Sequence, residues 1–213
     1  MGQASSQRVT KVRGVQYHVF NGGIAPDRER AKIASRTLQT GLLYSRGRNV
    51  VYSLGALTND LTNLHPTNTI VLAVKNDFIL GAVKCKRKND RYAEIEFVQT
   101  SAEFTGLCTA LVKRAIKELN DDGYACVKIW MYTNNGPAAC RCYLRAMFRS
   151  TRGRVYMRKN LFGKNRYEIV EIPRSEKAIR AVTNVLCGKG YGYVKENSFG
   201  NAVFFVCKKG HKV

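Results

Sequence analysis

The spacing of hydrophobic positions changes twice between residues 92 and 121. Side chains alternate between two faces in Tyr92–Thr100, which is the pattern of a β-strand. Gly106 interrupts this pattern, and beyond it apolar residues recur every fourth position, as on one face of an amphipathic helix. The helical positions are Leu107, Leu111, Ala115 and Leu119. We expect this strand, glycine turn and helix to bring backbone N–H groups and the positive end of the helix dipole to one point, which suits a phosphate.

The alternation of elements continues beyond this helix. The polar residues 120–123 predict the end of the helix, and the apolar run 126–132 predicts a strand. Residues 134–137 have the composition of a turn, and Pro137 suits the first turn of a further helix. Residues 92–148 therefore predict the order strand, helix, strand, helix.

The flanking segments extend this pattern in both directions. Upstream we expect a strand, two helices and a hairpin (residues 12–20, 26–43, 52–63 and 70–86), with Asn76-Asp77 at the hairpin turn. Downstream we expect a strand, a helix and a hairpin (residues 167–172, 175–187, 191–195 and 202–208). We predict a flexible terminus over residues 1–11 and one domain over 12–213, with a core at about 28–161 and an extension at 162–213.

The central stretch resembles the GNAT superfamily of N-acetyltransferases. In that family a strand leads into a glycine turn and then a helix that begins T-A-L, as Val98, Gly106 and Thr109-Ala110-Leu111 do here. The following helix also matches, at Asn135, Ala139, Tyr143 and Phe148. The resemblance covers roughly residues 28–161. It implies an α/β (α+β) fold with a mixed, mostly antiparallel sheet flanked by helices, here followed by a C-terminal helix-hairpin extension.

The resemblance also implies a reaction, the transfer of an acetyl group from acetyl-CoA to an amine, and a set of site residues. The backbone of Gly106, Leu107, Cys108 and Thr109 would hold the donor, the N–H groups near Phe97 and Val98 would polarise the thioester, and Asn135 would line the channel. A base must take a proton from the ammonium, and Glu94 and Glu96 are candidates because they share one face of the strand. Tyr143 is the candidate acid for the leaving thiolate, because an ordinary phenol has a pKa of about 10.

Some positions depart from the family pattern. Glu103 stands where the family has Arg or Gln, Phe104 and Cys108 replace small residues of the turn, and Met147 replaces the glycine of a G-F pair. Side chains at the turn oppose the close backbone approach that glycine permits. A second reading therefore stays open: a GNAT-like fold without catalysis that serves as a basic structural or binding protein.

The charge balance bears on this second reading. The chain has 213 residues with 36 Lys and Arg against 15 Asp and Glu, a net charge of +21. Such an excess predicts an anionic partner, namely nucleic acid, anionic lipid, or a viral or other protein assembly. The alternative is a solvated basic surface without a dedicated partner. If the chain is an enzyme, its partner is instead an amine substrate.

The cysteines predict a reducing compartment. Their number, 7, is odd, no C-x-x-C motif occurs, and several of them lie in apolar runs. We interpret them as reduced, buried thiols of a cytoplasmic protein. We expect no metal site, because Cys140 and Cys142 are too close for a usual ligand pair and no histidine is near them in sequence.

The N-terminus matches a lipidation pattern. Met1-Gly2-Gln3-Ala4-Ser5-Ser6 conforms to M-G-x-x-x-[ST], in which a myristoyl group is attached to Gly2. One myristoyl chain binds membranes weakly, so a second signal is needed, and the basic residues after it can supply one. This predicts membrane association, with a virion component as one form of it. The alternative is a small polar terminus that fits the pattern by chance.

Overall fold

The structure is a computed structural model that describes residues 14–38, 54–88, 92–101, 104, 106–131, 136–149, 154–160, 167–173, 175, 177 and 202–207. The order of elements in these ranges agrees with the predicted order, with one further strand, Arg154–Asn160, before the strand expected at 167–172. The elements are β1 (Gln16–Asn21), α1 (Ala25–Thr37), α2 (Leu54–Thr62), β2 (Asn68–Lys75), β3 (Phe78–Arg87), β4 (Tyr92–Thr100), α3 (Leu107–Asp121), β5 (Cys126–Met131), α4 (Gly136–Arg149), β6 (Arg154–Asn160), β7 (Tyr167–Ile172) and β8 (Ala202–Cys207).

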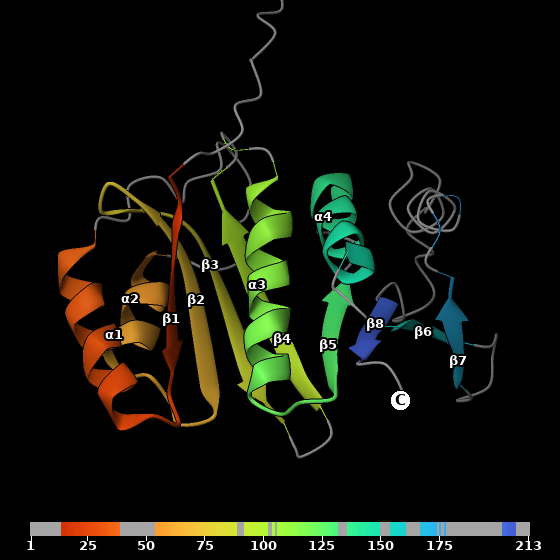
Figure 1. Ribbon diagram of the computed structural model, residues 1–213, viewed down its shortest axis with the longest axis horizontal. Coiled ribbons are helices and arrows are strands. Elements are labelled where there is room, and N and C mark those ends of the chain that lie inside the picture. Colours follow the sequence, from red (N-terminus) through yellow and green to blue (C-terminus); the bar gives the residue numbers. More distant parts are fainter. Residues whose placement is uncertain are drawn as a thin grey trace, which may run out of the picture.

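The strands form one mixed sheet in the order β1-β2-β3-β4-β5-β8-β6-β7 (Figure 1). Neighbouring strands are antiparallel except β4 and β5, which are parallel. A parallel pair needs a crossover connection, and α3 supplies it. The expected fold class, a mixed and mostly antiparallel sheet flanked by helices, is confirmed.

The predicted central hairpin is present as β2 and β3. Its turn residues Asn76 and Asp77 both have positive φ, 49° and 63°. Asn and Asp tolerate the left-handed region better than other non-glycine residues, and two such residues in succession match the twist of the flanking strands. Local sequence therefore sets this turn.

The sheet separates two hydrophobic clusters. Alternate residues of β2 face opposite sides, so that Val71 and Ala73 belong to one cluster and Ile70 and Leu72 to the other. The first cluster packs the sheet against α3 and α4, and the second packs it against α1 and α2. Residues Asn68–Val74 are consequently all buried, as expected for a strand covered on both faces.

The C-terminal extension contributes a strand to the interior of the sheet. The expected strand at 202–208 is present as β8, which pairs with β5 on one side and β6 on the other. Both edges of β8 are therefore occupied by strands distant in sequence. The other arm of the expected hairpin, residues 191–195, and nearly all of the expected helix 175–187 lie outside the described residues.

The expectation that all the cysteines are reduced is wrong for four of them. Cys108 on α3 is joined to Cys142 on α4, and Cys126 on β5 is joined to Cys207 on β8. The second pair forms because Cys126 and Cys207 are direct cross-strand partners, which a sequence without strand order cannot reveal. Cys85 is free and buried, as expected, and burial raises the pKa of its thiol.

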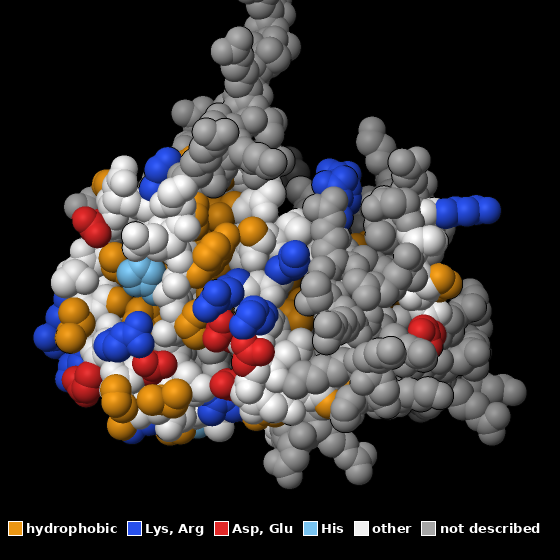
Figure 2. All heavy atoms as spheres, in the orientation of Figure 1, with side chains coloured by type: hydrophobic (Ala, Val, Ile, Leu, Met, Phe, Trp, Pro, Cys, Tyr) orange, Lys and Arg blue, Asp and Glu red, His pale blue; other side chains and the backbone are white. Residues whose placement is uncertain are grey.

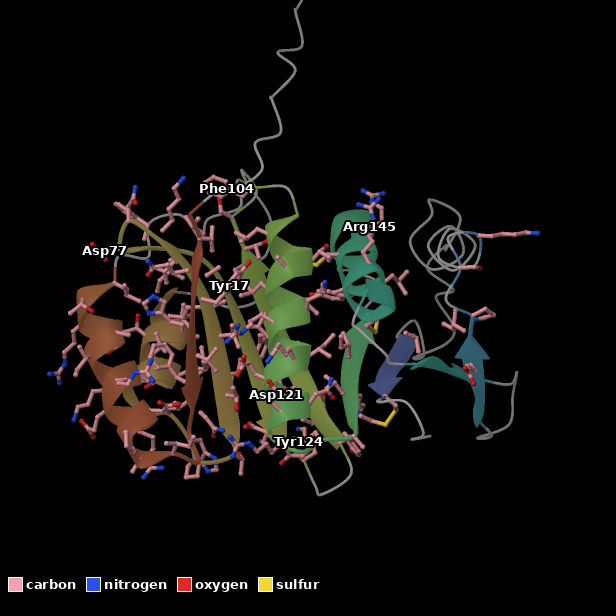
Figure 3. All side chains as sticks on the ribbon, in the orientation of Figure 1. Tyr17, Asp77, Phe104, Asp121, Tyr124 and Arg145 are labelled. Carbon is pink, nitrogen blue, oxygen red and sulfur yellow. A yellow bond between two sulfur atoms is a disulfide. The ribbon has the colours of Figure 1, made fainter. Side chains whose placement is uncertain are left out.

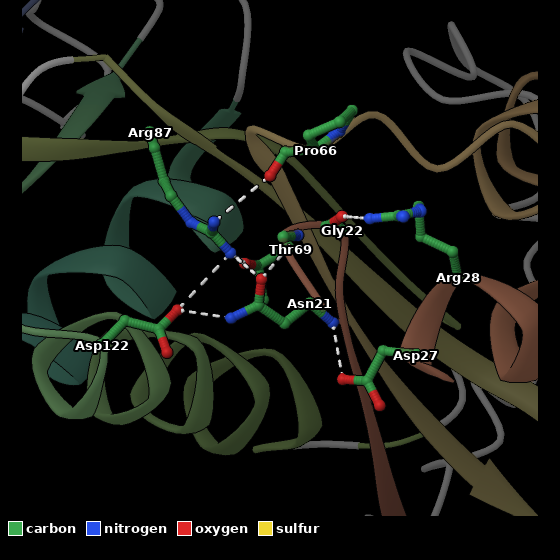
Figure 4. A network of polar contacts seen from close by, with 9 residues as sticks. Asn21, Gly22, Asp27, Arg28, Pro66, Thr69, Arg87 and Asp122 are labelled. Carbon is green, nitrogen blue, oxygen red and sulfur yellow. Dashed lines mark hydrogen bonds and ion pairs between the residues drawn. The ribbon is translucent and has the colours of Figure 1, made fainter. Parts of the chain in front are cut away.

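A polar network joins several elements at the end of the sheet near the C-terminus of α3 (Figure 4). Arg87 donates hydrogen bonds to the side chain of Asn21, to the carbonyl oxygen of Pro66 at 3.2 Å and to Oγ1 of Thr69 at 3.2 Å. Asn21 Nδ2 in turn donates to Asp122 Oδ2 at 3.0 Å, and Arg87 Nη2 lies 3.7 Å from the same oxygen. The network thus links β1, β2 and β3 to the residue that follows α3.

We expect the Arg87→Met variant to lose about 1–3 kcal/mol of unfolding free energy, because it removes the shared donor of partly buried groups. Urea denaturation followed by circular dichroism measures the loss. The control is Lys117→Met, which removes an exposed pair with Asp121 and should change stability by less than about 0.5 kcal/mol. Equal effects of the two variants would contradict the structural role of the network.

We expect the double variant Cys126→Ala/Cys207→Ala to be less stable than the wild type by about 4 kcal/mol, the loop-closure contribution for a bridge across a separation of 81 residues. Denaturation with and without a reductant provides the measurement. Reductant should destabilise the wild type more than the double variant. Non-reducing peptide mapping that finds no link between Cys126 and Cys207 would refute the pairing.

Candidate functional site

The parallel ladder between β4 and β5 is short. It joins Tyr92–Ile95 to Cys126–Ile129, whereas β4 continues to Thr100 and β5 to Met131. Beyond the ladder, β5 stays paired with β8 to Met131 and β4 stays paired with β3 to Thr100. The two parallel strands therefore separate after Ile95, and the β5-facing edge of residues 96–100 extends beyond the ladder.

A β-bulge in β4 coincides with this separation. Ile95 lies opposite Cys85 and Phe97 lies opposite Lys84, so Glu96 is the extra residue of β4. The bulge reverses the alternation of side chains: Ile95 lies in the α3 cluster, whereas Phe97 packs against the cluster beneath α1 and α2. Bulges are common beside active sites, because they redirect a side chain and interrupt pairing.

The start of α3 lies next along the chain. Gly106 is its N-cap with φ 81°, and a Cβ at this position would meet no atom of the described residues within 4 Å. The cap makes no side-chain hydrogen bond, the first turn carries no acidic residue, and the backbone ladder begins with Ala110 N to Gly106 O at 3.0 Å. The first N–H groups of a helix lack intrahelical partners. This turn can therefore receive an anion.

The residues that depart from the family pattern have different environments in the structure. Phe104 is half-buried and packs against the α3 cluster, while Cys108 is held in its disulfide with Cys142. Met147 is fully buried in the same cluster, where it fills core volume. Glu103 lies outside the described residues. The expectation that side chains at Phe104 and Cys108 oppose the close approach of a ligand to the backbone stays a prediction.

The two candidate bases lie in a cluster of alternating charges. Lys88 Nζ is 3.3 Å from Glu96 Oε1 and 3.7 Å from Glu94 Oε2, and Lys128 Nζ is 3.6 Å from Glu94 Oε2. The Glu94 and Glu96 side chains are only 13% and 21% exposed. The structure thus brings both predicted bases together, and each already has a lysine ammonium beside it.

Tyr143, the candidate acid, lies on α4 within the α3 cluster and is 8% exposed. Burial raises the pKa of its phenol to about 12. A phenol with this pKa holds its proton more tightly than an ordinary thiol, whose pKa is about 8.5. Its packing role is evident from the structure, and its role as an acid stays a prediction.

Other predicted residues have mixed positions. Phe97 and Val98 lie on β4 just after the bulge, and Leu107 is buried at the first position of α3, with Thr109 two residues later. Asn135 and Gly2 lie outside the described residues, so the channel and lipidation roles stay predictions. Within the described part of the chain, no helix has the length and apolar character needed to span a bilayer.

The surface charge has no single centre on the face that Figure 2 shows. Lys and Arg side chains stand at several separate places there, and Asp and Glu side chains lie among those at the centre. Ion pairs account for part of the described charge, as for Lys84 with Asp60 at 2.9 Å. The anionic partner therefore stays a prediction that rests on net charge.

Sequence reasoning missed Lys88 and Lys128 as neighbours of the bases. The sequence contains a signal for Lys88, because Lys88 and Glu94 lie on either side of the short connection between β3 and β4 and are therefore close in space. Lys128 comes from β5, and only the register Glu94 opposite Lys128 places it there. No sequence pattern announced the Cys108–Cys142 link, because it depends on how α3 packs beside α4.

A family model and several solved structures match this chain. Residues 39–147 match the model of the acetyltransferase (GNAT) family. Similar solved structures include a GNAT family acetyltransferase from Elizabethkingia anophelis with acetyl-CoA bound (14% identity, 92% of this chain and 99% of that one, TM-score 0.42). Another is the PaiA N-acetyltransferase from Thermoplasma acidophilum in complex with coenzyme A (14% identity, 75% and 98%, TM-score 0.41).

A third similar structure is the aminoglycoside 6'-N-acetyltransferase from Enterococcus faecium (14% identity, 54% of this chain and 61% of that one, TM-score 0.36). A comparison with curated proteins gives no match. The family model covers more than half of the sequence, in the part that forms α2, the β2–β4 strands, α3, β5 and most of α4. The chain therefore belongs to the GNAT family of acetyltransferases.

Proposed function

We propose that this protein transfers an acetyl group from acetyl-CoA to the amine of an acceptor. The observation that carries the proposal is the coincidence of three features: the end of the β4–β5 ladder at Ile95, the bulge at Glu96 and the open turn at Gly106. They bring the end of the ladder, two carboxylates and a helix start onto one continuous stretch of chain. An acyl transfer to an amine needs a held thioester, a polarised carbonyl and a base for the ammonium.

The turn at the start of α3 suits the diphosphate of the donor. The backbone N–H groups of Leu107, Cys108 and Thr109 belong to the first helical turn, and the helix dipole favours negative charge there. Gly106 leaves room for close approach, and the disulfide of Cys108 keeps that side chain beside α4. Acetyl-CoA supplies the acetyl thioester, whose carbonyl carbon accepts the amine.

The edge of β4 beyond the ladder suits the reacting group. N–H groups of the backbone near Phe97 and Val98 are candidates to polarise the thioester carbonyl, since donors aimed at developing negative charge stabilise an acyl-transfer transition state. Glu96 begins this part of the strand, and Glu94 lies in the same charge cluster. Their role is to hold an incoming ammonium and to take its proton.

A second candidate function is a GNAT-fold binding protein without catalysis, which the net charge of +21 favours. Thermal shift with acetyl-CoA separates the two. A catalytic protein should be stabilised by about 2.7 kcal/mol at a concentration 100 times the dissociation constant. If acetyl-CoA gives no shift and nucleic acid or anionic vesicles bind in a salt-dependent way, the binding function is correct instead.

Substituting Gly106 tests the donor site, and the chain offers a matched control. We expect both Gly106→Ala and Gly123→Ala to destabilise the fold by about 1 kcal/mol, because both glycines have positive φ and open surroundings. Only Gly106→Ala should also weaken acetyl-CoA binding in calorimetry, since Gly123 lies at the other end of α3. Equal affinities of the two variants would exclude the turn as the donor site.

Substituting Tyr143 tests the proton donor. If its phenol protonates the leaving thiolate, Tyr143→Phe should lower kcat by about 100-fold with little change in the midpoint of denaturation. Tyr124→Phe is the control, because Tyr124 lies at the end of α3 opposite Phe104 (Figure 3). An unchanged kcat would show that Tyr143 serves packing alone, as its raised pKa favours.

A further inference from the structure

Lys88 lies between the two carboxylates that we assign as bases. Its Nζ is 3.3 Å from Glu96 Oε1 and 3.7 Å from Glu94 Oε2, and the Lys88 side chain is 31% exposed. It follows the end of β3, so its side chain extends from the neighbouring strand toward β4. An alkyl ammonium is therefore already present where the proposed reaction needs the ammonium of an acceptor.

Other paired lysines of the described chain have different partners. Lys84 pairs with Asp60 on α2 and Lys117 pairs with Asp121 on α3, while Lys128 lies near Glu94 and over the ring of Tyr92. Among the ion pairs of the described residues, Glu96 is paired with Lys88 alone. Because Glu96 is also the bulged residue where β4 leaves β5, Lys88 is the lysine that these ion pairs link to the point where the two strands separate.

We infer that the protein acetylates its own Lys88. This inference rests on the proposed function, because it uses the same donor and the same bases. In the reaction a bond forms between Nζ and the thioester carbonyl carbon, and the bond from that carbon to sulfur breaks. The ammonium gives one proton to Glu96 and thence to solvent, and the second proton lost by nitrogen goes to the leaving thiolate. The products are acetyl-lysine and the free thiol.

The charges around Lys88 set the pH dependence of this step. Burial lowers the pKa of Lys88, but attraction by Glu94, Glu96 and Tyr92 outweighs it, and the net pKa is raised. From the next strand, Lys128 approaches Glu94 and opposes this attraction. Only the neutral amine attacks the thioester. Because the pKa of Lys88 is raised, the rate of acetylation should still increase with pH in the range where an ordinary lysine is already deprotonated.

Acetylation would change the charge of the acceptor site. Among the described residues, the two carboxylates face the ammonium groups of Lys88 and Lys128 before acetylation and that of Lys128 afterwards. The site thereby gains one net negative charge. An external acceptor with a cationic amine would then meet carboxylates that are no longer shared with Lys88, so the modified protein should bind such acceptors with a lower KM than the unmodified protein.

The test incubates the full chain with acetyl-CoA that carries an isotopically labelled acetyl group. Peptide mass spectrometry then follows labelling at each lysine, and free thiol release is measured in parallel with a panel of external amines. Lys88 should be labelled before Lys84 and Lys113, with one thiol released per Lys88 acetylated. Glu96→Gln should slow this labelling by about 100-fold, and Lys84→Arg should leave it unchanged.

Lys88→Arg keeps the positive charge between the carboxylates and removes the acceptor. It should show no labelling at residue 88 while acetyl-CoA binding in calorimetry stays as in the wild type. A measurement without acetyl-CoA tests the charge cluster itself. In chemical acylation with acetic anhydride across pH, the midpoint of Lys88 labelling should lie above that of an ordinary lysine, and Glu94→Gln/Glu96→Gln should lower it.

The outcomes separate this inference from the proposed function. If external amines are acetylated while labelling is spread over exposed lysines without preference for Lys88, the inference is wrong and the proposed function stands. If acetyl-CoA neither binds nor is consumed, the proposed function fails and the inference fails with it. Labelling of Lys88 at the same rate in the Glu96→Gln protein would also overturn the inference, because the step would then not depend on the base.

Discussion

The short parallel ladder between β4 and β5 is the constraint on which the site depends. Four residue pairs hold the strands together, and beyond Ile95 each strand keeps only its antiparallel partner. The bulge at Glu96 shifts the course of β4 where its ladder with β5 ends. Each strand continues in regular pairing with its antiparallel neighbour, so the separation of β4 and β5 lies within an otherwise continuous sheet.

The rest of the fold holds this opening in place. Clusters on the two faces of the sheet bury nearly all of β2 and the middle of β3, and α3, which starts at the turn of Gly106, packs on one of them. The Cys108–Cys142 link ties the first turn of α3 to α4, and the Arg87 network ties the other end of α3 to β1 and β3. Both ends of the helix are thus fixed relative to the sheet.

Charge within the site is balanced locally despite the strongly basic sequence. Glu94 and Glu96 lie beside Lys88 and Lys128. The carboxylates that could bind the ammonium of an acceptor therefore already bind lysine ammonium groups of the chain. This arrangement connects the proposed chemistry with the further inference, since the same two carboxylates position the internal amine and would receive an external one. The buried phenol of Tyr143, in contrast, lies in an apolar environment that opposes its ionisation.

Local patterns in the sequence determined the elements, the Asn76-Asp77 turn, the glycine at the start of α3 and the family, because each depends on residues close together in the chain. Tertiary structure alone decided the pairing of cysteines, the place of β8 between β5 and β6, and the lysines beside Glu94 and Glu96. These features depend on which distant strands become neighbours and in which register. Hydrophobic periodicity shows which face of a strand is buried, but it contains no information about which strand lies beside it.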